Sequence, residues 1–194
     1  MLNIVLFGAP GAGKGTQAVM LAEKYELVHL STGDILRKEI AAGTDLGKQA
    51  QGFTDKGEFV PDELVIDIIR SQIEQNADVK GFIFDGFPRT TAQAEALDQL
   101  MSEKEMEITS MIALDVENEE LVNRLTKRGA YSGRADDQSM DVIRNRIDVY
   151  HQKTKPLIVY YQACKKYHPI DGTGDIAEIF DRLCKFVEGL RFEV

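Results

Sequence analysis

Few of the side chains that mark redox, metal-binding or disulfide-rich proteins are present in this sequence. It has two cysteines, three histidines and no tryptophan. Cys164 and Cys184 do not form a Cys-x-x-Cys pair, so we expect two buried, unpaired thiols in a reducing compartment. His29, His151 and His168 are scattered along the chain, which disfavours a metal site built from histidine.

Long apolar runs and an excess of positive charge are also missing. No stretch approaches the roughly 20 apolar residues that span a bilayer, and the apolar start of the chain is too short for a signal peptide. The formal net charge of −9 argues against nucleic acid or an anionic membrane as a partner. Without a long linker, a repeat or a low-complexity segment, residues 1–194 are expected to form one cytoplasmic domain.

A glycine-rich loop near the start of the chain carries the clearest chemical signal. Residues 2–7 predict a buried parallel strand and residues 15–25 predict a helix. The loop between them matches G-x-x-x-x-G-K-[S/T], except that Gly15 follows Lys14 and the hydroxyl comes at Thr16. Backbone N–H groups, the helix N-terminus and the Lys14 ammonium then all favour a bound phosphate. The alternative is a structural turn that binds nothing, but such a turn has no use for a lysine.

Strands and helices alternate along the rest of the chain, which predicts an α/β fold with a mainly parallel sheet. The other predicted strands are 27–30, 81–85, 108–116 and 167–170. The predicted helices include 35–42, 47–56, 118–127, 140–164 and 175–190, with two more that open at residues 61 and 90 or 91. Ligands of such sheets lie beyond the carboxyl ends of the strands, so the turns after residues 7, 30 and 85 should converge.

Two charged residues flank the end of the predicted strand 81–85. Asp85 ends an apolar strand at the binding edge, where a carboxylate can hold Mg²⁺ directly or through water. The alternative is a carboxylate that caps the following turn. Arg89 follows Pro88, whose fixed φ stiffens the approach of the arginine, and its planar fork suits two phosphate oxygens at once.

Half of the ten arginines fall in one short part of the chain: Arg124, Arg128, Arg134, Arg144 and Arg146. Arg124 and Arg128 are four residues apart and share a helix face. Arg134 lies in segment 129–138, which is too glycine-rich and polar to hold a core. We interpret Arg134 and Arg146 as functional, because a glycine-rich lid bracketed by arginines has little structural purpose. Arg144 suits a solvated, salt-bridged helix face better.

Four motifs together closely resemble the adenylate kinases, within the nucleoside monophosphate kinase family: GAPGAGKGTQ, STGDILR, FIFDGFPRTTAQ and KRG…SGRADD. The resemblance covers essentially the whole chain. It implies a five-stranded parallel sheet in a P-loop fold, a monophosphate-binding segment at 31–60 and a short lid at 129–138 without a zinc site. It also implies a monomer that transfers a phosphate reversibly from Mg²⁺-bound ATP to AMP, giving two ADP, in adenine nucleotide homeostasis and nucleotide biosynthesis.

The resemblance also implies roles for individual residues. ATP would be held by Gly11, Ala12, Gly13, Lys14, Gly15, Thr16, Arg124, Arg128 and Gly174. AMP would be held by Thr32, Arg37, the backbone of Glu58, Phe59 and Val60, and by Gly86, Phe87, Pro88, Arg89, Gln93, Arg134 and Arg146. The catalytic cations would be Lys14, Arg89, Arg134 and Arg146. The stretch 138–145 is one residue longer than the usual short-lid pattern, which leaves Arg144 open beside Arg146, although helix phase favours Arg146.

Two other functions are compatible with parts of this pattern. A kinase acting on UMP or CMP is the nearest, but Thr32 and Thr90 resemble the adenylate pattern rather than the Ala and Asn of the pyrimidine enzymes. A nucleotide sensor without phosphotransfer would need the phosphate loop but not the lid arginines, and the chain lacks the Asn-Lys-x-Asp stretch of switch GTPases. An AMP phosphate is already anionic and needs no general base, in agreement with the lack of a conspicuous His–Asp pair near the motifs.

Overall fold

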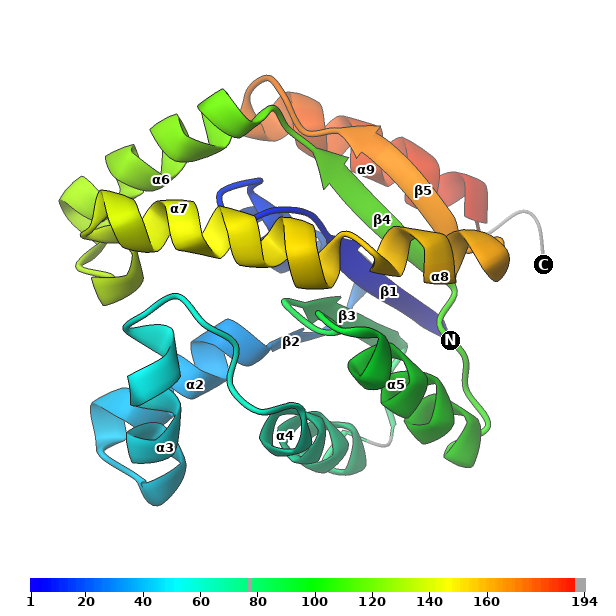
Figure 1. The fold of residues 1–194 in the computed structure, drawn as a ribbon. Helices are drawn as coiled ribbons and strands as arrows, with labels where there is room; N and C mark the ends of the chain where they lie inside the picture. Colours follow the sequence, from blue (N-terminus) through cyan, green and yellow to red (C-terminus); the bar gives the residue numbers. More distant parts are fainter. Residues whose placement is uncertain (77, 191–194) are drawn as a thin grey trace.

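The computed structural model describes residues 1–76 and 78–190, and its centre is a five-stranded parallel sheet (Figure 1). The strand order is β2-β3-β1-β4-β5, and all four neighbouring pairs are parallel. The strands are β1 (Leu2–Phe7), β2 (Val28–Ser31), β3 (Gly81–Asp85), β4 (Ser110–Asp115) and β5 (Tyr167–Asp171). The predicted α/β fold with a parallel sheet is therefore confirmed.

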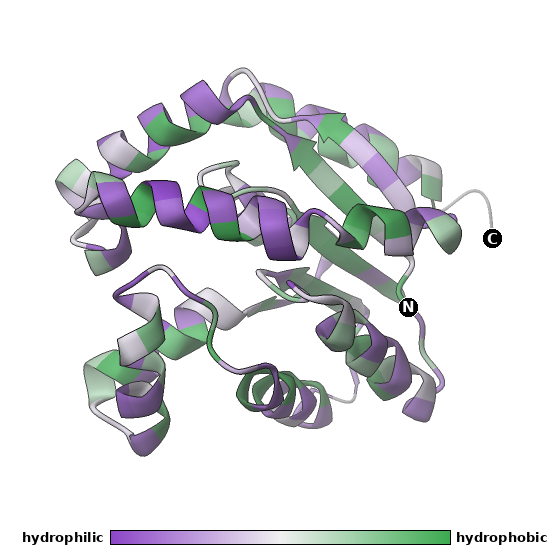
Figure 2. Cartoon of the chain, in the orientation of Figure 1, coloured by the Kyte–Doolittle hydropathy of each residue, from purple (hydrophilic) through white to green (hydrophobic). Residues whose placement is uncertain are grey.

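The sheet is buried on both faces, which is why its strands read as nearly continuous apolar runs. In β1, Ile4 and Leu6 enter one apolar core while Val5 and Phe7 enter the other. Figure 2 shows the central strands as mostly hydrophobic, whereas the edge strand β5 is paler, in line with its greater exposure. Alternate side chains of each central strand thus anchor a different layer of helices.

Helices cover the two faces in separate layers. One face carries α1 (Lys14–Tyr25) and α9 (Ile176–Leu190), which contact each other. The opposite face carries α4 (Asp62–Glu74), α5 (Thr91–Glu103) and α8 (Leu157–Ala163). No helix within the described residues is both long and apolar enough to cross a membrane.

A helical hairpin, α2 (Thr32–Ala42) and α3 (Asp45–Thr54), follows β2. Ser31 caps α2 by accepting a hydrogen bond from the Asp34 N–H (3.3 Å), and Thr44 caps α3 in the same way. Gly43 ends α2 in the left-handed conformation, with φ of 64°, as the sequence predicts. These caps fix where the hairpin leaves the sheet edge.

The C-terminal half differs from the prediction in two places. Segment 129–138, predicted to be irregular, is helical in its first part, because α6 (Asn118–Ser132) continues to a turn at Gly133, before η1 (Ala135–Asp137). The prediction of a single helix over 140–164 is wrong. Helix α7 (Met140–Val149) passes into a π-helical turn, η2 (Tyr150–Thr154), and α8 follows as a separate helix. Pro156 lacks an N–H and crowds the preceding turn, and the chain widens there, with the Lys155 N–H donating to the Tyr150 carbonyl (2.8 Å).

The two cysteines lie in different environments. Cys184 is buried on the inner face of α9, as expected, but Cys164 is exposed at the end of α8, so the prediction of a second buried thiol is wrong. Both thiols are free.

Candidate functional site

A cavity of about 540 Å³ opens at the carboxyl edge of the sheet. Strand order reverses at β1, since the chain places β2 and β3 on one side of it and β4 and β5 on the other. This switch point is where open parallel sheets bind ligands. The predicted site residues that line the cavity are Gly11, Gly13, Lys14, Gly15, Thr16, Thr32, Arg37, Glu58, Phe59, Val60, Asp85, Gly86, Phe87, Pro88, Arg89, Gln93, Arg128, Arg134 and Arg146.

The glycine loop turns sharply between β1 and α1. Gly8 has φ of 143° and Gly13 has φ of 93°, conformations that side-chain-bearing residues rarely adopt. Lys14 curls back over the loop, where its Nζ donates to the carbonyls of Gly8 (2.8 Å) and Ala9 (3.0 Å). The loop therefore presents the N-terminus of α1 and one ammonium group to the same space.

The surroundings of Lys14 lower the pKa of its ammonium group. Burial lowers the pKa of Lys14 to about 8, the carboxylate of Asp85 opposes this effect, and the cations Arg89, Arg146 and Arg128 add to it. The ammonium is thus in a site with a surplus of positive charge. A polyanion bound in the cavity would supply the missing counter-charge.

Asp85 ends β3 beside the loop and is 8% exposed. Its Oδ2 lies 3.6 Å from Nε2 of His29, which is beyond hydrogen-bond distance, and His29 itself does not line the cavity. Although burial alone raises the pKa of Asp85, the neighbouring His29 and the positive charges of Lys14 and Arg89 lower it overall. Because the two residues lie on neighbouring strands far apart in sequence, only the β2–β3 register reveals their proximity.

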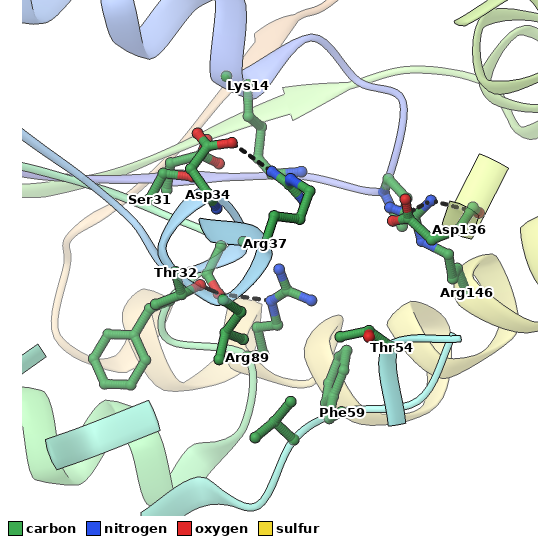
Figure 3. Close-up of a pocket in the computed structure, with 18 of the residues that line it drawn as sticks. Lys14, Ser31, Thr32, Asp34, Arg37, Thr54, Phe59, Arg89, Asp136 and Arg146 are labelled. Atoms are coloured by element: carbon green, nitrogen blue, oxygen red, sulfur yellow. Dashed lines mark hydrogen bonds and ion pairs between the residues drawn. The ribbon is translucent and has the colours of Figure 1, made fainter. Parts of the chain in front are cut away.

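Contacts to both its main chain and its side chain hold Arg89 (Figure 3). Its Nε donates to the Gly86 carbonyl (2.6 Å), which also accepts from the Thr32 hydroxyl (2.9 Å). Its N–H donates to Oε1 of Gln93 (2.7 Å), and its carbonyl accepts from the Thr154 hydroxyl (3.0 Å). Thr154 lies in the π-helical turn η2, and the sequence analysis did not identify it.

Asp62, which the sequence analysis also missed, orients Gln93. It accepts from Nε2 of Gln93 (2.7 Å) and from the hydroxyl of Thr90 (2.8 Å), the N-cap of α5. Its place after Pro61, at the start of α4, gave it the appearance of an ordinary helix-opening residue. Its contacts with Thr90 and Gln93 depend on how α4 packs against α5, and sequence spacing does not show this packing.

Three arginines from the C-terminal half share two carboxylates. Asp137, whose side chain is fully buried, accepts from Nε of Arg128 (2.6 Å) and from Nη1 of Arg146 (2.6 Å). Asp136 lines the cavity and pairs with Arg134 (3.0 Å) and Arg146 (3.0 Å). Burial lowers the pKa of the Arg146 guanidinium, although Asp136 and Asp137 oppose that shift. These pairs keep the three guanidinium groups gathered on one side of the cavity.

Arg144 and Arg146, which the sequence left open as alternatives, lie in different places. Arg146 lines the cavity, whereas Arg144 is exposed and does not. Arg37 enters from the opposite side, paired with Asp34 (2.6 Å) in the same helix. Figure 3 shows Lys14, Arg37 and Arg146 reaching the same space from separate elements.

Three predicted residues do not line the cavity: Ala12, Arg124 and Gly174. Ala12 is fully buried beneath the loop. Arg124 pairs with Glu120 (2.7 Å) and donates to the carbonyl of Gly172 (3.2 Å), which places it against the turn that contains Gly174. Arg124 and this turn therefore form a separate group next to the carboxyl end of β5.

Oxygen donors suited to a hard cation are present beside the loop. The Asp85 carboxylate and the Thr16 hydroxyl both line the cavity, and carboxylate and hydroxyl oxygens are the ligands that Mg²⁺ accepts. In the described part of the chain, no three Cys, His, Asp or Glu side chains converge as they would around a bound metal ion.

A preformed phosphate loop at the switch point of a parallel sheet, opposed by several cations, defines a P-loop nucleotide-binding phosphotransferase. The family model for adenylate kinase matches residues 6–166. Proteins named adenylate kinase from Flavobacterium psychrophilum and Bacteroides thetaiotaomicron are 54% and 52% identical, each over 98% of this chain and 100% of its own length. One from Methanococcoides burtonii is 43% identical over 96% of this chain and 99% of its own length. The chain belongs to the adenylate kinase family.

Proposed function

We propose that this protein transfers the γ-phosphate of ATP reversibly to AMP, giving two ADP. Membership of the adenylate kinase family supports the reaction. The observation that carries the proposal is the convergence of Lys14, Arg89 and Arg146 on one cavity from three separate parts of the chain. A cavity so rich in cations, in a protein with net charge −9, suits two polyanionic substrates.

The two substrates occupy opposite halves of the site in this proposal. The loop Gly11–Thr16 and Arg128 hold the ATP phosphates, and Arg124 with the turn at Gly174 lies by the adenine. Thr32, Arg37, Gln93, Arg89 and the segment 58–60 hold AMP. Segments 31–60 and 129–138 are the moving parts that close over the substrates, as the resemblance implies.

Catalysis in this arrangement needs positioning and charge, and no general base. The nucleophile is an AMP phosphate oxygen, which is anionic at neutral pH. Lys14, Arg89, Arg134 and Arg146 align the two polyanions and stabilise the charge on the transferred phosphoryl group. The lowered pKa of Asp85 keeps its carboxylate charged, which makes it unsuitable as a proton donor.

Magnesium fits the oxygen donors beside the loop. Asp85, directly or through water, and Thr16 would hold the ion. When bound, Mg²⁺ neutralises charge on the ATP phosphates. The protein groups then position the same phosphates and exclude water, which would otherwise hydrolyse ATP.

We further propose that the protein acts as a monomer in the cytoplasm. All the cations assigned to the reaction come from one chain, so the site needs no second copy.

Removing the guanidinium of Arg89 tests the proposal. We expect Arg89→Ala to lower the turnover of Mg·ATP and AMP by about a thousandfold or more, since guanidinium groups of this kind contribute on that scale. Arg144→Ala is the matched control, because Arg144 is exposed and outside the cavity, and it should stay within about twofold of wild type. Near-normal turnover in folded Arg89→Ala protein would contradict the proposed phosphate transfer to AMP.

A further inference from the structure

Arg89 carries a partly buried positive charge that has no carboxylate partner in the described part of the chain. Among residues 1–76 and 78–190, no carboxylate oxygen lies within 4.0 Å of its guanidinium nitrogens, whereas Arg128, Arg134 and Arg146 each have one. Burial, together with the neighbouring charges of Arg146 and Arg37, lowers the pKa of Arg89 to about 10, even though Asp85 acts in the opposite direction. One hydrogen bond from Nε to the Gly86 carbonyl does not offset the partial burial of this cation.

The aromatic ring of Phe59 supplies a second contact. Its centroid lies 5.2 Å from Cζ of Arg89, inside the range of a cation–π interaction. Figure 3 shows the ring and Arg89 on the same side of the cavity. The ammonium of Lys153 lies 5.9 Å from the same centroid, so two cations gather around one ring.

The local chain fixes the direction of this side chain. Phe59 belongs to the segment between α3 and α4, where the Glu58 N–H donates to the Phe53 carbonyl (2.9 Å). Val60 next to it is buried in the apolar core, which leaves Phe59 facing the cavity. The same segment packs Gly57 against the side chain of Arg146. The segment thus touches two of the proposed catalytic cations.

We propose that Phe59 is a positioning residue for Arg89. Its ring holds the guanidinium through its π face while the Gly86 carbonyl engages Nε, and the remaining donors point at the acceptor phosphate. This gives the side chain of Phe59 a role beyond the backbone contact to AMP that the family resemblance implies. The inference rests on the proposed role of Arg89 as a phosphate clamp.

Graded fluorination of the ring tests the electrostatic nature of this contact. Replacing Phe59 with 4-fluoro-, 3,5-difluoro- and 3,4,5-trifluorophenylalanine nearly keeps its shape while it weakens the negative face of the ring step by step. We expect kcat/KM for AMP to fall in steps, by about 2- to 30-fold in total, the span that corresponds to a cation–π contact. Hydrogen exchange at Nε of Arg89, followed by NMR, should become faster in the same order.

The matched control is the same series at Phe53, an aromatic residue of α3 that is packed against the core and has no cation over its ring in the described ranges. It should change neither quantity. A flat series at Phe59 in active enzyme, with Arg89→Ala still strongly impaired, would overturn the role of Phe59 alone. If Arg89→Ala were itself unimpaired, the clamp role of Arg89 would fall as well.

Discussion

At the scale of single residues, the two carboxylates of η1 determine how the C-terminal arginines are held. Asp137 is fully buried between Arg128 and Arg146, while the side chain of Asp136 is 20% exposed and faces the cavity. Deleting one partner of a buried pair leaves an uncompensated charge, whereas a partly exposed partner can be replaced by water. The neighbouring aspartates therefore differ in what they stabilise.

We expect Asp137→Ala to lower the free energy of unfolding by about 3 kcal/mol, because Arg128 and Arg146 lose their shared counter-charge. Asp136→Ala should lower it by about 1 kcal/mol or less. Urea unfolding of the two variants measures both values. Equal losses would contradict the distinction drawn between the buried and the cavity-facing carboxylate.

The pKa of Lys14 predicts how pH affects nucleotide binding. With that pKa lowered to about 8 in the free protein, the ammonium is charged below this pH and loses its proton as pH rises through it. Because a bound polyphosphate favours the charged form, the affinity for Mg·ATP should fall about tenfold between pH 7 and pH 9. Calorimetric titration at several pH values measures this, and Lys14→Arg should show a much flatter dependence, since its guanidinium stays charged. An equal slope in both proteins would refute this explanation.

At the scale of elements, the α2–α3 hairpin depends on one close approach. A Cβ at Gly47 would overlap the carbonyl of Glu39, so the two helices pack together only with glycine there. Helix α2 contributes Thr32 and Arg37 to the AMP side of the proposed site, and α3 packs against it. A substitution that disrupts this contact should therefore affect the binding of AMP more than the binding of ATP.

Gly47→Ala is expected to raise KM for AMP several-fold and to cost about 1–3 kcal/mol of stability through overpacking, with the affinity for ATP nearly unchanged. Gly52→Ala is the matched control in the same helix, because a Cβ there meets no atom within 4 Å. It should leave KM unchanged and stabilise α3 slightly. Steady-state kinetics with each substrate varied in turn decides the matter, and parallel shifts in both KM values would argue against a separate acceptor unit.

Elements that are determined by neighbouring residues could be predicted from the sequence. The strand at 81–85 was predicted with its observed bounds, because an apolar run between turn residues needs little else to be defined. The π-helical turn at 150–154 was not predicted, since an apolar helical periodicity continues across it and only Pro156 indicated a disturbance. Likewise, the proximity of His29 to Asp85 and the pairing of Asp62 with Gln93 depend on packing between distant segments, which one sequence does not show.

At the scale of the whole molecule, the cations gathered at the cavity contrast with the negative net charge of the chain. The chain carries a net charge of −9, but the groups that converge on the cavity include Lys14, Arg37, Arg89 and Arg146. Sheet topology explains how Lys14, Arg37 and Arg89 meet, because the carboxyl ends of β1, β2 and β3 lie side by side. Arg146 reaches the same cavity from α7. The fold therefore concentrates positive potential where two polyanions are proposed to react, and leaves the outer surface acidic.

Phosphoryl transfer from ATP to AMP is tested most directly by a coupled assay with Mg·ATP and each of AMP, CMP, UMP and GMP, using Lys14→Met as the control. We expect ADP formation that depends on AMP and is lost in the control. Turnover that prefers UMP or CMP would keep the fold and the mechanism but contradict AMP as the acceptor. Tight ATP binding without turnover on any acceptor would contradict the central claim and favour a nucleotide sensor.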